Sequence, residues 1–309
     1  MDLFLTILFS VMAPILILVG LGFAVQRRHN LDLATLSKLQ IHVLIPAAIL
    51  YFLLSAKLPI SEAWPTFWFT AVMFAAHFAV GWLLGAVLRQ DRAMKALLGL
   101  AIAFPNSGNY GVPLIQLTMP PDYLLHQAVS LSVHMILITT LGVWLIKGGN
   151  GLWSLGSTLF ATPMVPAVAL GFGMKAAGIE LPQPLAIPLK LMGEAFTPLA
   201  LFLLGAQLSA VNVLSGGGVI AAATGLKLLA APVISFALAT AFGFTHDLVA
   251  LFTLGTAIPT GVVLTVLTAQ YASGASFAAA MVFVSTVLSA LTITLWVYGL
   301  RLIGYLPPF

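Results

Sequence analysis

Long apolar windows with almost no charged residues recur along the whole chain. Each window is close to the ~20 residues that a helix needs to cross a hydrocarbon layer of ~30 Å. Alternating ten-residue segments, typical of membrane barrel strands, do not appear. The pattern therefore predicts an all-α integral membrane protein with ten spans, over residues 3–25, 37–55, 65–88, 96–118, 123–146, 155–174, 186–206, 217–242, 248–271 and 277–302.

Composition and charge agree with this pattern. Of the 309 residues, 61% are hydrophobic and 6% are charged, and no cysteine is present to form a disulfide or a thiolate metal site. The net charge of +4 is better explained by cytoplasmic loops than by nucleic-acid binding. If the first loop is cytoplasmic, seven basic residues lie inside and four lie outside. This bias predicts a multi-pass membrane protein with both termini on the outer face.

Prolines within the spans reveal an internal repeat. Pro166, Pro198 and Pro259 follow Pro14, Pro46 and Pro105 by 152, 152 and 154 positions. Three matches in order predict a duplicated five-span unit, over residues 1–148 and 149–309. An odd number of spans inverts the second copy, and inverted repeats are typical of secondary transporters. The alternative is that membrane helices simply tolerate proline.

The stretch AFPNSGNYGVPL, residues 103–114, places helix breakers at the centre of the fourth span. Pro105 lies about ten residues in, or ~15 Å deep at ~1.5 Å per residue. Proline removes an amide donor, and Gly108 and Gly111 permit backbone angles that a helix does not use. Pro259 is the repeat partner in the ninth span, so both helices are expected to break. Broken backbone at this depth must be buried in protein or line a watery cavity, so the two breaks are expected to cross.

The polar residues around the breaks have two interpretations. They either pair only the freed backbone groups or also bind a ligand. Lys227 lies deep in the eighth span, where an ionisable residue is a candidate functional site, and no aspartate lies at similar depth. The sequence thus favours an anionic ligand, a carboxylate above all. The predicted binding residues are Asn106, Ser107, Gly108, Asn109, Thr260, Gly261 and Lys227, and the predicted structural residues of the crossing are Pro105, Gly111, Pro113 and Pro259.

Three further residues are candidates for ion coupling. His77 and His134 lie near span centres, where each either carries a proton or serves as a neutral hydrogen-bonding group. Glu194 follows Lys190 by four residues, so an ion pair on one helix face competes with a role in proton coupling. Sodium coupling has less support because no carboxylate lies near the breaks. No cofactor, metal site or enzyme is predicted, since metalloprotease, paired-aspartate and nucleophile-elbow patterns are missing. An anion channel is the other alternative.

The motif PNSGNYGVP resembles the Asn-x-Gly-x-x-Gly-x-Pro element of the auxin efflux carrier family. The matching residues are Asn106, Gly108, Gly111 and Pro113 or, a step later, Asn109 and Gly111. The resemblance extends over the whole chain and implies a fixed scaffold of spans 1, 2, 6 and 7. Spans 3–5 and 8–10 would form a mobile, elevator-like transport part. Bacterial members of this size are associated with malonate, malate and similar acids, and plant members with auxin.

The chain lacks the long hydrophilic loop of the plant proteins, which argues against auxin as its substrate. The related bile acid–sodium symporters share crossed broken helices, so a sodium-coupled symporter is an alternative. Carriers of this type often form homodimers. The expected partners are therefore a small organic anion, the lipid bilayer and a second copy of the chain.

Overall fold

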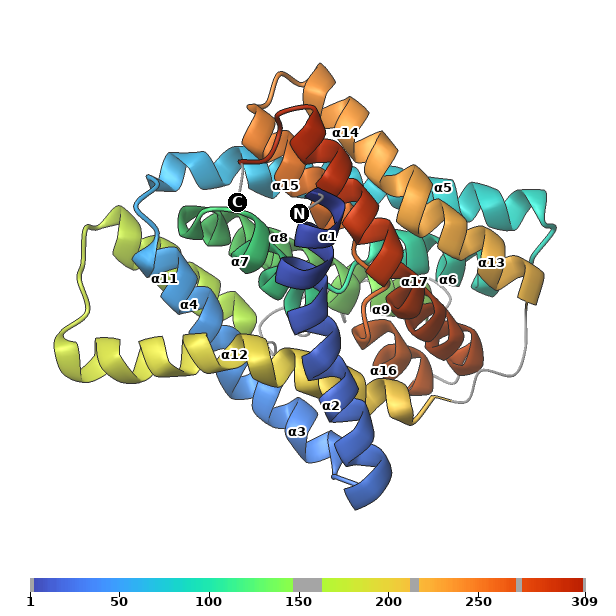
Figure 1. The fold of residues 1–309 in the computed structure, drawn as a ribbon, viewed down its shortest axis with the longest axis horizontal. Coiled ribbons are helices and arrows are strands. Elements are labelled where there is room, and N and C mark those ends of the chain that lie inside the picture. Colours follow the sequence, from blue (N-terminus) through green and yellow to red (C-terminus); the bar gives the residue numbers. More distant parts are fainter. Residues whose placement is uncertain (1–2, 147–162, 212–216, 271–273, 308–309) are drawn as a thin grey trace.

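The computed structural model describes residues 3–146, 163–211, 217–270 and 274–307. Over these ranges the chain is almost entirely helical, and an isolated bridge between Pro105 and Thr260 stands in place of any strand (Figure 1). The prediction of an all-α fold is confirmed for this part of the chain.

The helices of the first half follow one another with short connections. In chain order they are α1 (Leu3–Ile7), η1 (Leu8–Met12), α2 (Ala13–His29), α3 (Leu33–Leu39), η2 (Gln40–Leu44), α4 (Ile45–Ser55), η3 (Ile60–Glu62), α5 (Ala63–Val87), α6 (Arg92–Ala103), η4 (Ser107–Gly111), α7 (Val112–Thr118), η5 (Pro121–Tyr123), α8 (Leu124–Leu137), η6 (Ile138–Gly142) and α9 (Val143–Ile146).

The second half has a similar succession of helices, in which the shorter helices α15 and α16 divide one predicted span between them. Its elements are α11 (Met164–Ala176), α12 (Gln183–Ser209), α13 (Gly217–Gly225), η7 (Leu226–Ala230), α14 (Ala231–Ala241), α15 (His246–Ala257), α16 (Val263–Gln270) and α17 (Ala275–Leu302).

Seven helices of the described ranges are long and apolar enough to cross a membrane. They cover Leu3–His29, Leu33–Ser55, Ala63–Val87, Pro121–Ile146, Gln183–Ser209, Gly217–Ala241 and Ala275–Leu302. The other three predicted spans are not described as single long helices. Residues 96–118 and 248–271 are each divided between two shorter helices, and the segment 155–174 begins outside the described residues.

Wide π-helical turns explain how several of the long helices accommodate proline. Such a turn ends two residues before Pro14, Pro46, Pro113 and Pro232. Proline lacks an amide hydrogen, and its ring displaces the carbonyl of the preceding turn. Widening the turn relieves that clash while the helix continues.

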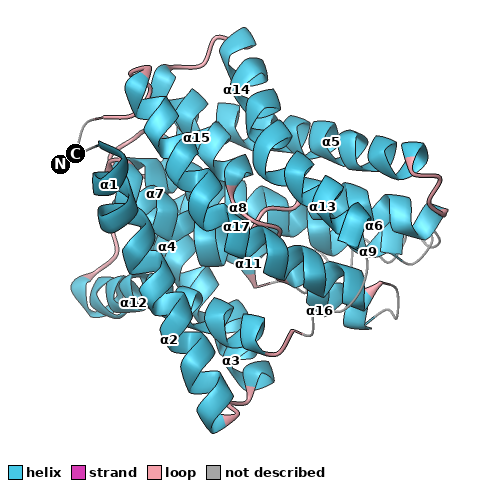
Figure 2. Cartoon of the chain, turned by 45° about the vertical axis from the view of Figure 1, so that its right-hand side comes forward, coloured by secondary structure: helices cyan, strands magenta, loops and turns pink. Residues whose placement is uncertain are grey.

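The helices pack into two groups. In the first group α2 packs on α12, and α4 packs on both α11 and α12. In the second, α5 packs on α6 and α8, α14 packs on α15, and α17 packs on α13, α15 and α16. Both views show α2 and α3 together at the lower corner of the molecule, and α12 packs against both of them (Figures 1 and 2).

Two glycines bring the backbones of α2 and α12 into direct contact. A Cβ atom added to Gly22 would lie 1.9 Å from the carbonyl oxygen of Phe202. One added to Gly205 would lie 1.8 Å from the carbonyl oxygen of Val19. Only glycine permits this approach, which is a common way for membrane helices to gain packing energy.

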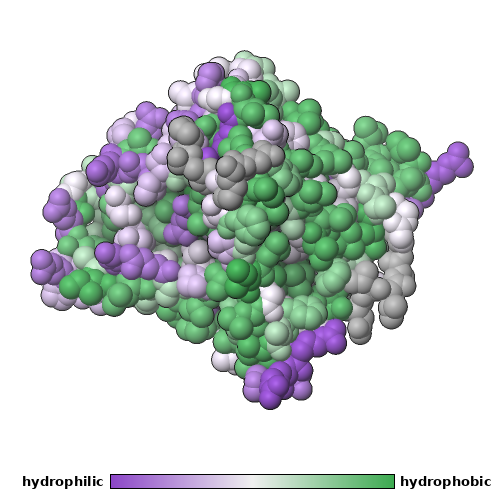
Figure 3. Space-filling view, in the orientation of Figure 1, coloured by the Kyte–Doolittle hydropathy of each residue, from purple (hydrophilic) through white to green (hydrophobic). Residues whose placement is uncertain are grey.

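The surface is apolar over most of the face shown in Figure 3, with hydrophilic residues gathered at its margins. One hydrophilic margin lies at the junction of α2 and α3, where Arg27, Arg28 and His29 end α2. This distribution is expected of a protein with lipid around its middle.

Candidate binding site at two interrupted helices

Two helices lose their regular backbone and meet at their breaks. Helix α6 ends at Ala103, and α15 ends at Ala257; the next residue of each, Phe104 and Ile258, is extended. The amide of Asn106 donates to the carbonyl of Pro259 at 2.8 Å. The amide of Gly261 donates to the carbonyl of Phe104 at 2.9 Å. The breaks at residues 104–106 and 258–262 therefore run antiparallel and side by side, and we call this pair of segments the crossing.

The C-terminal end of α6 receives its hydrogen bonds from the second half of the chain. Thr260 Oγ1 donates to the carbonyl of Ala101 at 2.8 Å, and Lys227 Nζ donates to that of Ile102 at 3.1 Å. Both side chains are fully buried. The C-terminal end of a helix leaves its last carbonyls unpaired and carries partial negative charge. A lysine there supplies both a hydrogen-bond donor and a positive charge.

The other groups freed by the breaks are paired within the same region. The amide of Thr260 donates to Ser285 Oγ at 3.1 Å, and Gln127 Nε2 donates to the carbonyl of Ser107 at 2.7 Å. The hydroxyl of Ser107 lies 2.9 Å from His134 Nδ1. These three groups are thus matched, as burial requires.

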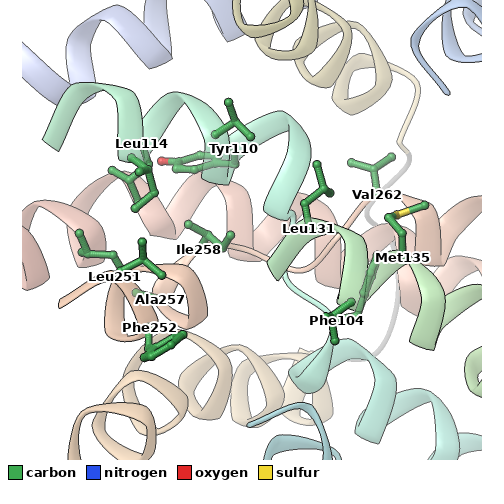
Figure 4. Packing of buried hydrophobic residues seen from close by; sticks show 14 of the residues in the cluster. Phe104, Tyr110, Leu114, Leu131, Met135, Leu251, Phe252, Ala257, Ile258 and Val262 are labelled. Atoms are coloured by element: carbon green, nitrogen blue, oxygen red, sulfur yellow. The ribbon is translucent and has the colours of Figure 1, made fainter. Parts of the chain in front are cut away.

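A cavity of about 60 Å³ lies beside the crossing. Figure 4 shows four apolar residues of its wall near one another in the core: Phe104, Leu131, Met135 and Val262. The wall comprises Phe104–Asn109 and Gly261–Val263 with Val266 from the interrupted helices, Ser37, Gln40, Ile41 and Ile45 from α3, η2 and α4, Leu131 and Met135 from α8, and Gln207 from α12. The cavity therefore lies at the border between the two helix groups.

Two polar atoms of the wall have no protein partner. Asn106 Nδ2 is buried and makes no hydrogen bond, whereas Asn109 Oδ1 accepts one from Gln40 Nε2 at 2.7 Å. Gln207 also has an unpaired oxygen, Oε1, although its Nε2 donates to Ser37 Oγ at 3.3 Å. An unpaired buried donor costs about 1–3 kcal/mol, so the wall offers an unmet hydrogen bond to a ligand.

The structure brings together some of the predicted site residues and separates others. Asn106, Ser107, Gly108, Asn109 and Gly261 line the cavity. Thr260 and Lys227 are outside the wall, and their polar atoms bond to α6 instead.

The structural residues of the crossing have distinct neighbours. A Cβ atom on Gly111 would lie 2.6 Å from Gln127 Nε2, and one on Gly261 would lie 2.5 Å from the Phe104 ring. A larger residue at either position would therefore have to push a neighbouring side chain aside. Pro113 lies in the first turn of α7, two residues after the wide turn η4 ends, and Pro105 forms the isolated bridge with Thr260, the residue after Pro259.

The candidate coupling residues have different environments. His77 is buried, with Nε2 3.1 Å from the carbonyl of Ala231 and 3.4 Å from Ser235 Oγ. His134 contacts Ser107, the residue that follows the first segment of the crossing. Glu194 forms the ion pair with Lys190 at 3.7 Å, and both side chains are more than half exposed. The ion pair expected from the spacing of four residues is therefore present, and the role of Glu194 in proton coupling stays a prediction.

Sequence reasoning missed Gln40, Ser37 and Gln207, which complete the polar part of the wall. Gln40 had a signal, because it is an amide inside an apolar window. Gln207 lies at the end of such a window, where a polar residue is ordinary.

A comparison with models of protein families shows to which family the chain is related. A family model described as a membrane transport protein matches residues 7–154 and again residues 152–297. No curated protein matches the chain. Together the two matches cover almost all of the chain. The chain thus belongs to the auxin efflux carrier family of membrane transport proteins.

Proposed function

We propose that the protein is a secondary transporter of small organic anions that works by alternating access around the cavity at the crossing. Ten spans in two inverted five-span units, residues 1–148 and 149–309, would supply the architecture. One observation carries the proposal: two interrupted helices from opposite halves meet beside a cavity in whose wall the side-chain amide nitrogen of Asn106 lacks a partner. Helix interruptions of this kind form binding sites in carriers with inverted repeats.

The chemistry of the wall favours a carboxylate. Asn106 Nδ2 is a donor, and the hydroxyl of Ser107 can also donate. A carboxylate oxygen accepts both kinds of hydrogen bond. Asn109 is held in place by Gln40 and would orient the second oxygen or a second carboxylate. Lys227 would act through α6, without contact to the ligand.

The size of the cavity favours a short aliphatic acid. Its volume is about 60 Å³. An apolar cavity that holds a benzene ring measures about 150 Å³. In this conformation an aromatic acid such as auxin would not fit, whereas acetate or malonate would need little adjustment of the wall. Malonate and malate are therefore the first acids to test.

The position of the cavity favours relative movement of the two helix groups. Gln40 and Gln207 come from the group that contains α2, α4, α11 and α12, and the crossing belongs to the other. Glycine contacts fix α2 against α12, so this group would be the scaffold. The group with the crossing would move, carry the anion and expose it to either side of a bacterial inner membrane. Both termini facing outward and a homodimer remain predictions.

Ligand binding and transport test the proposal in two stages. A thermal-shift screen of the purified protein against mono- and dicarboxylates should reveal a stabilising acid, since ligand at about 100 times its Kd stabilises a protein by about 2.7 kcal/mol. Uptake of that acid into proteoliposomes should follow. Asn106→Ala should abolish uptake while leaving the melting temperature without ligand unchanged. Gln183→Ala, which alters an exposed amide at the start of α12, is the control.

The results also separate the alternatives. Wild-type uptake by Asn106→Ala would remove that residue from the site, and failure of every acid to bind or move would refute the proposal. Uptake that stops when sodium is replaced by choline would identify a sodium-coupled symporter. Single-channel currents far above the turnover of a carrier would identify an anion channel.

A further inference from the structure

Polar side chains of α5 and α8 pair at two successive turns, and we call Thr66, Thr70, His126, Ser130 and His134 the seam. Thr66 Oγ1 lies 2.7 Å from His126 Nδ1, and Thr70 Oγ1 lies 3.1 Å from Ser130 Oγ. One turn further, His134 follows on the same face of α8. Residues four apart share a helix face, so these contacts repeat turn by turn along the two helices.

These side chains use their hydrogen bonds in an unusual way. Serine and threonine in membrane helices commonly bond the carbonyl four residues earlier, as Ser132 does with Ala128 at 2.6 Å. Thr66 and Thr70 instead bond across to α8, and all the side chains of the seam are buried. Hydroxyl and imidazole groups can donate and accept at once, which is what proton transfer along a chain requires.

The outer end of the seam leads to a carboxylate. The Tyr123 ring lies 5.7 Å from the His126 ring, between centroids. Its hydroxyl donates to Asp247 Oδ2 at 2.6 Å. Both residues are only half-buried, so protons from water can reach this end.

The inner end of the seam reaches the cavity. His134 Nδ1 lies 2.9 Å from Ser107 Oγ, and Ser107 is part of the cavity wall. The titratable groups that face His134 are His77 of α5 and Lys227 of η7. Successive pairs in the seam are one helical turn apart, about 6 Å, which a single bridging water can span.

We propose that the α5–α8 seam conducts protons between Asp247 and His134 and couples each carboxylate to one proton. This proposal rests on the proposed transport function. When His134 is doubly protonated, both ring nitrogens are donors, so Ser107 Oγ accepts from Nδ1. The hydroxyl hydrogen of Ser107 is then free to donate to the carboxylate in the cavity. Loss of the proton from His134 removes that donor arrangement and releases the anion.

Proteoliposomes that contain a pH-sensitive dye test the coupling. The probe is radiolabelled malonate, or whichever acid the thermal-shift screen selects. Wild-type uptake should acidify the lumen. An inward proton gradient of about one pH unit should raise steady-state accumulation about tenfold for each coupled proton, because one unit is a tenfold difference in proton activity. His134→Gln and Thr70→Val should reduce that tenfold response to about onefold.

Matched variants separate a proton path from simple helix packing. Thr253 is fully buried in α15, and its hydroxyl bonds Val249 of the same helix, so Thr253→Val is the control for Thr70→Val. His29→Gln, at the exposed end of α2, is the control for His134→Gln. Both controls should keep the tenfold response.

Three outcomes would overturn the proposal. The first is an equal gradient response in Thr70→Val and Thr253→Val. The second is wild-type uptake without proton movement, which would refute the seam as a proton path and leave the transport function standing. The third is the absence of binding and uptake for every acid, which would refute the transport function and the coupling together.

Discussion

Replacement of Lys227 by methionine distinguishes a helix cap from a substrate ligand. Methionine keeps most of the volume and removes the donor. The carbonyl of Ile102 would then lose its 3.1 Å hydrogen bond inside the protein. Hydrogen bonds to charged groups contribute about 1.5–3 kcal/mol, and an unsatisfied buried group costs about 1–3 kcal/mol. We expect Lys227→Met to destabilise the protein by about 2 kcal/mol.

The assay combines thermal unfolding with ligand binding. Because Lys227 lies outside the cavity wall, the melting temperature should fall by several degrees while the Kd for the acid changes less than about threefold, or ~0.7 kcal/mol. Lys190→Met is the control, since its ion pair with Glu194 is exposed and such pairs contribute about 0–1 kcal/mol. A Kd weakened more than about tenfold at unchanged melting temperature would refute the capping role and make Lys227 a direct ligand.

Three other changes test separate parts of the structure. Gly205→Ala would place a methyl group 1.8 Å from the carbonyl of Val19, so it should destabilise the α2–α12 pair by about 1–3 kcal/mol in chemical unfolding; unchanged stability would contradict the close approach. Gln40→Leu leaves Asn109 Oδ1 unpaired and should raise the KM for uptake about tenfold, for a loss of ~1.4 kcal/mol, while an unchanged KM would show that Asn109 needs no support. Hydrogen bonds from a threonine hydroxyl and two backbone amides lower the pKa of Asp32 below its ordinary value of 3.8. The cap on α3 should therefore be complete above pH 3.8 and be lost as pH falls through the lowered pKa, as NMR titration of the carboxyl would show; an ordinary pKa would contradict the cap.

Some polar residues at the crossing hold the fold together, and others are available to a ligand, so their variants test different properties. The hydroxyl of Thr260 holds α6 by donating to the carbonyl of Ala101. The side-chain amide nitrogen of Asn106, by contrast, has no partner in the protein. Loss of uptake in a Thr260 variant would accordingly report on the fold as well as on binding. Asn106 is the cleaner probe of the ligand, because removal of its side chain breaks no side-chain hydrogen bond through Nδ2.

The sequence by itself determined where most of the helices lie and where two of them lose regular backbone. A run of apolar residues can be counted against the thickness of a membrane, and proline acts through its own missing amide. The contact between Lys190 and Glu194 was also readable, because it depends only on a spacing of four within one helix. Such features are local, so a linear pattern is sufficient to predict them.

Only the tertiary structure decided which polar groups meet. Lys227 bonds a carbonyl 125 residues away, and Gln40 bonds an amide 69 residues away. In a soluble protein an apolar stripe indicates which way a helix faces. In a membrane the lipid is as apolar as the protein core, so periodicity leaves the rotation of each helix undetermined. The packing of small residues and the pairing of buried polar atoms set that rotation, and both depend on neighbours far along the chain.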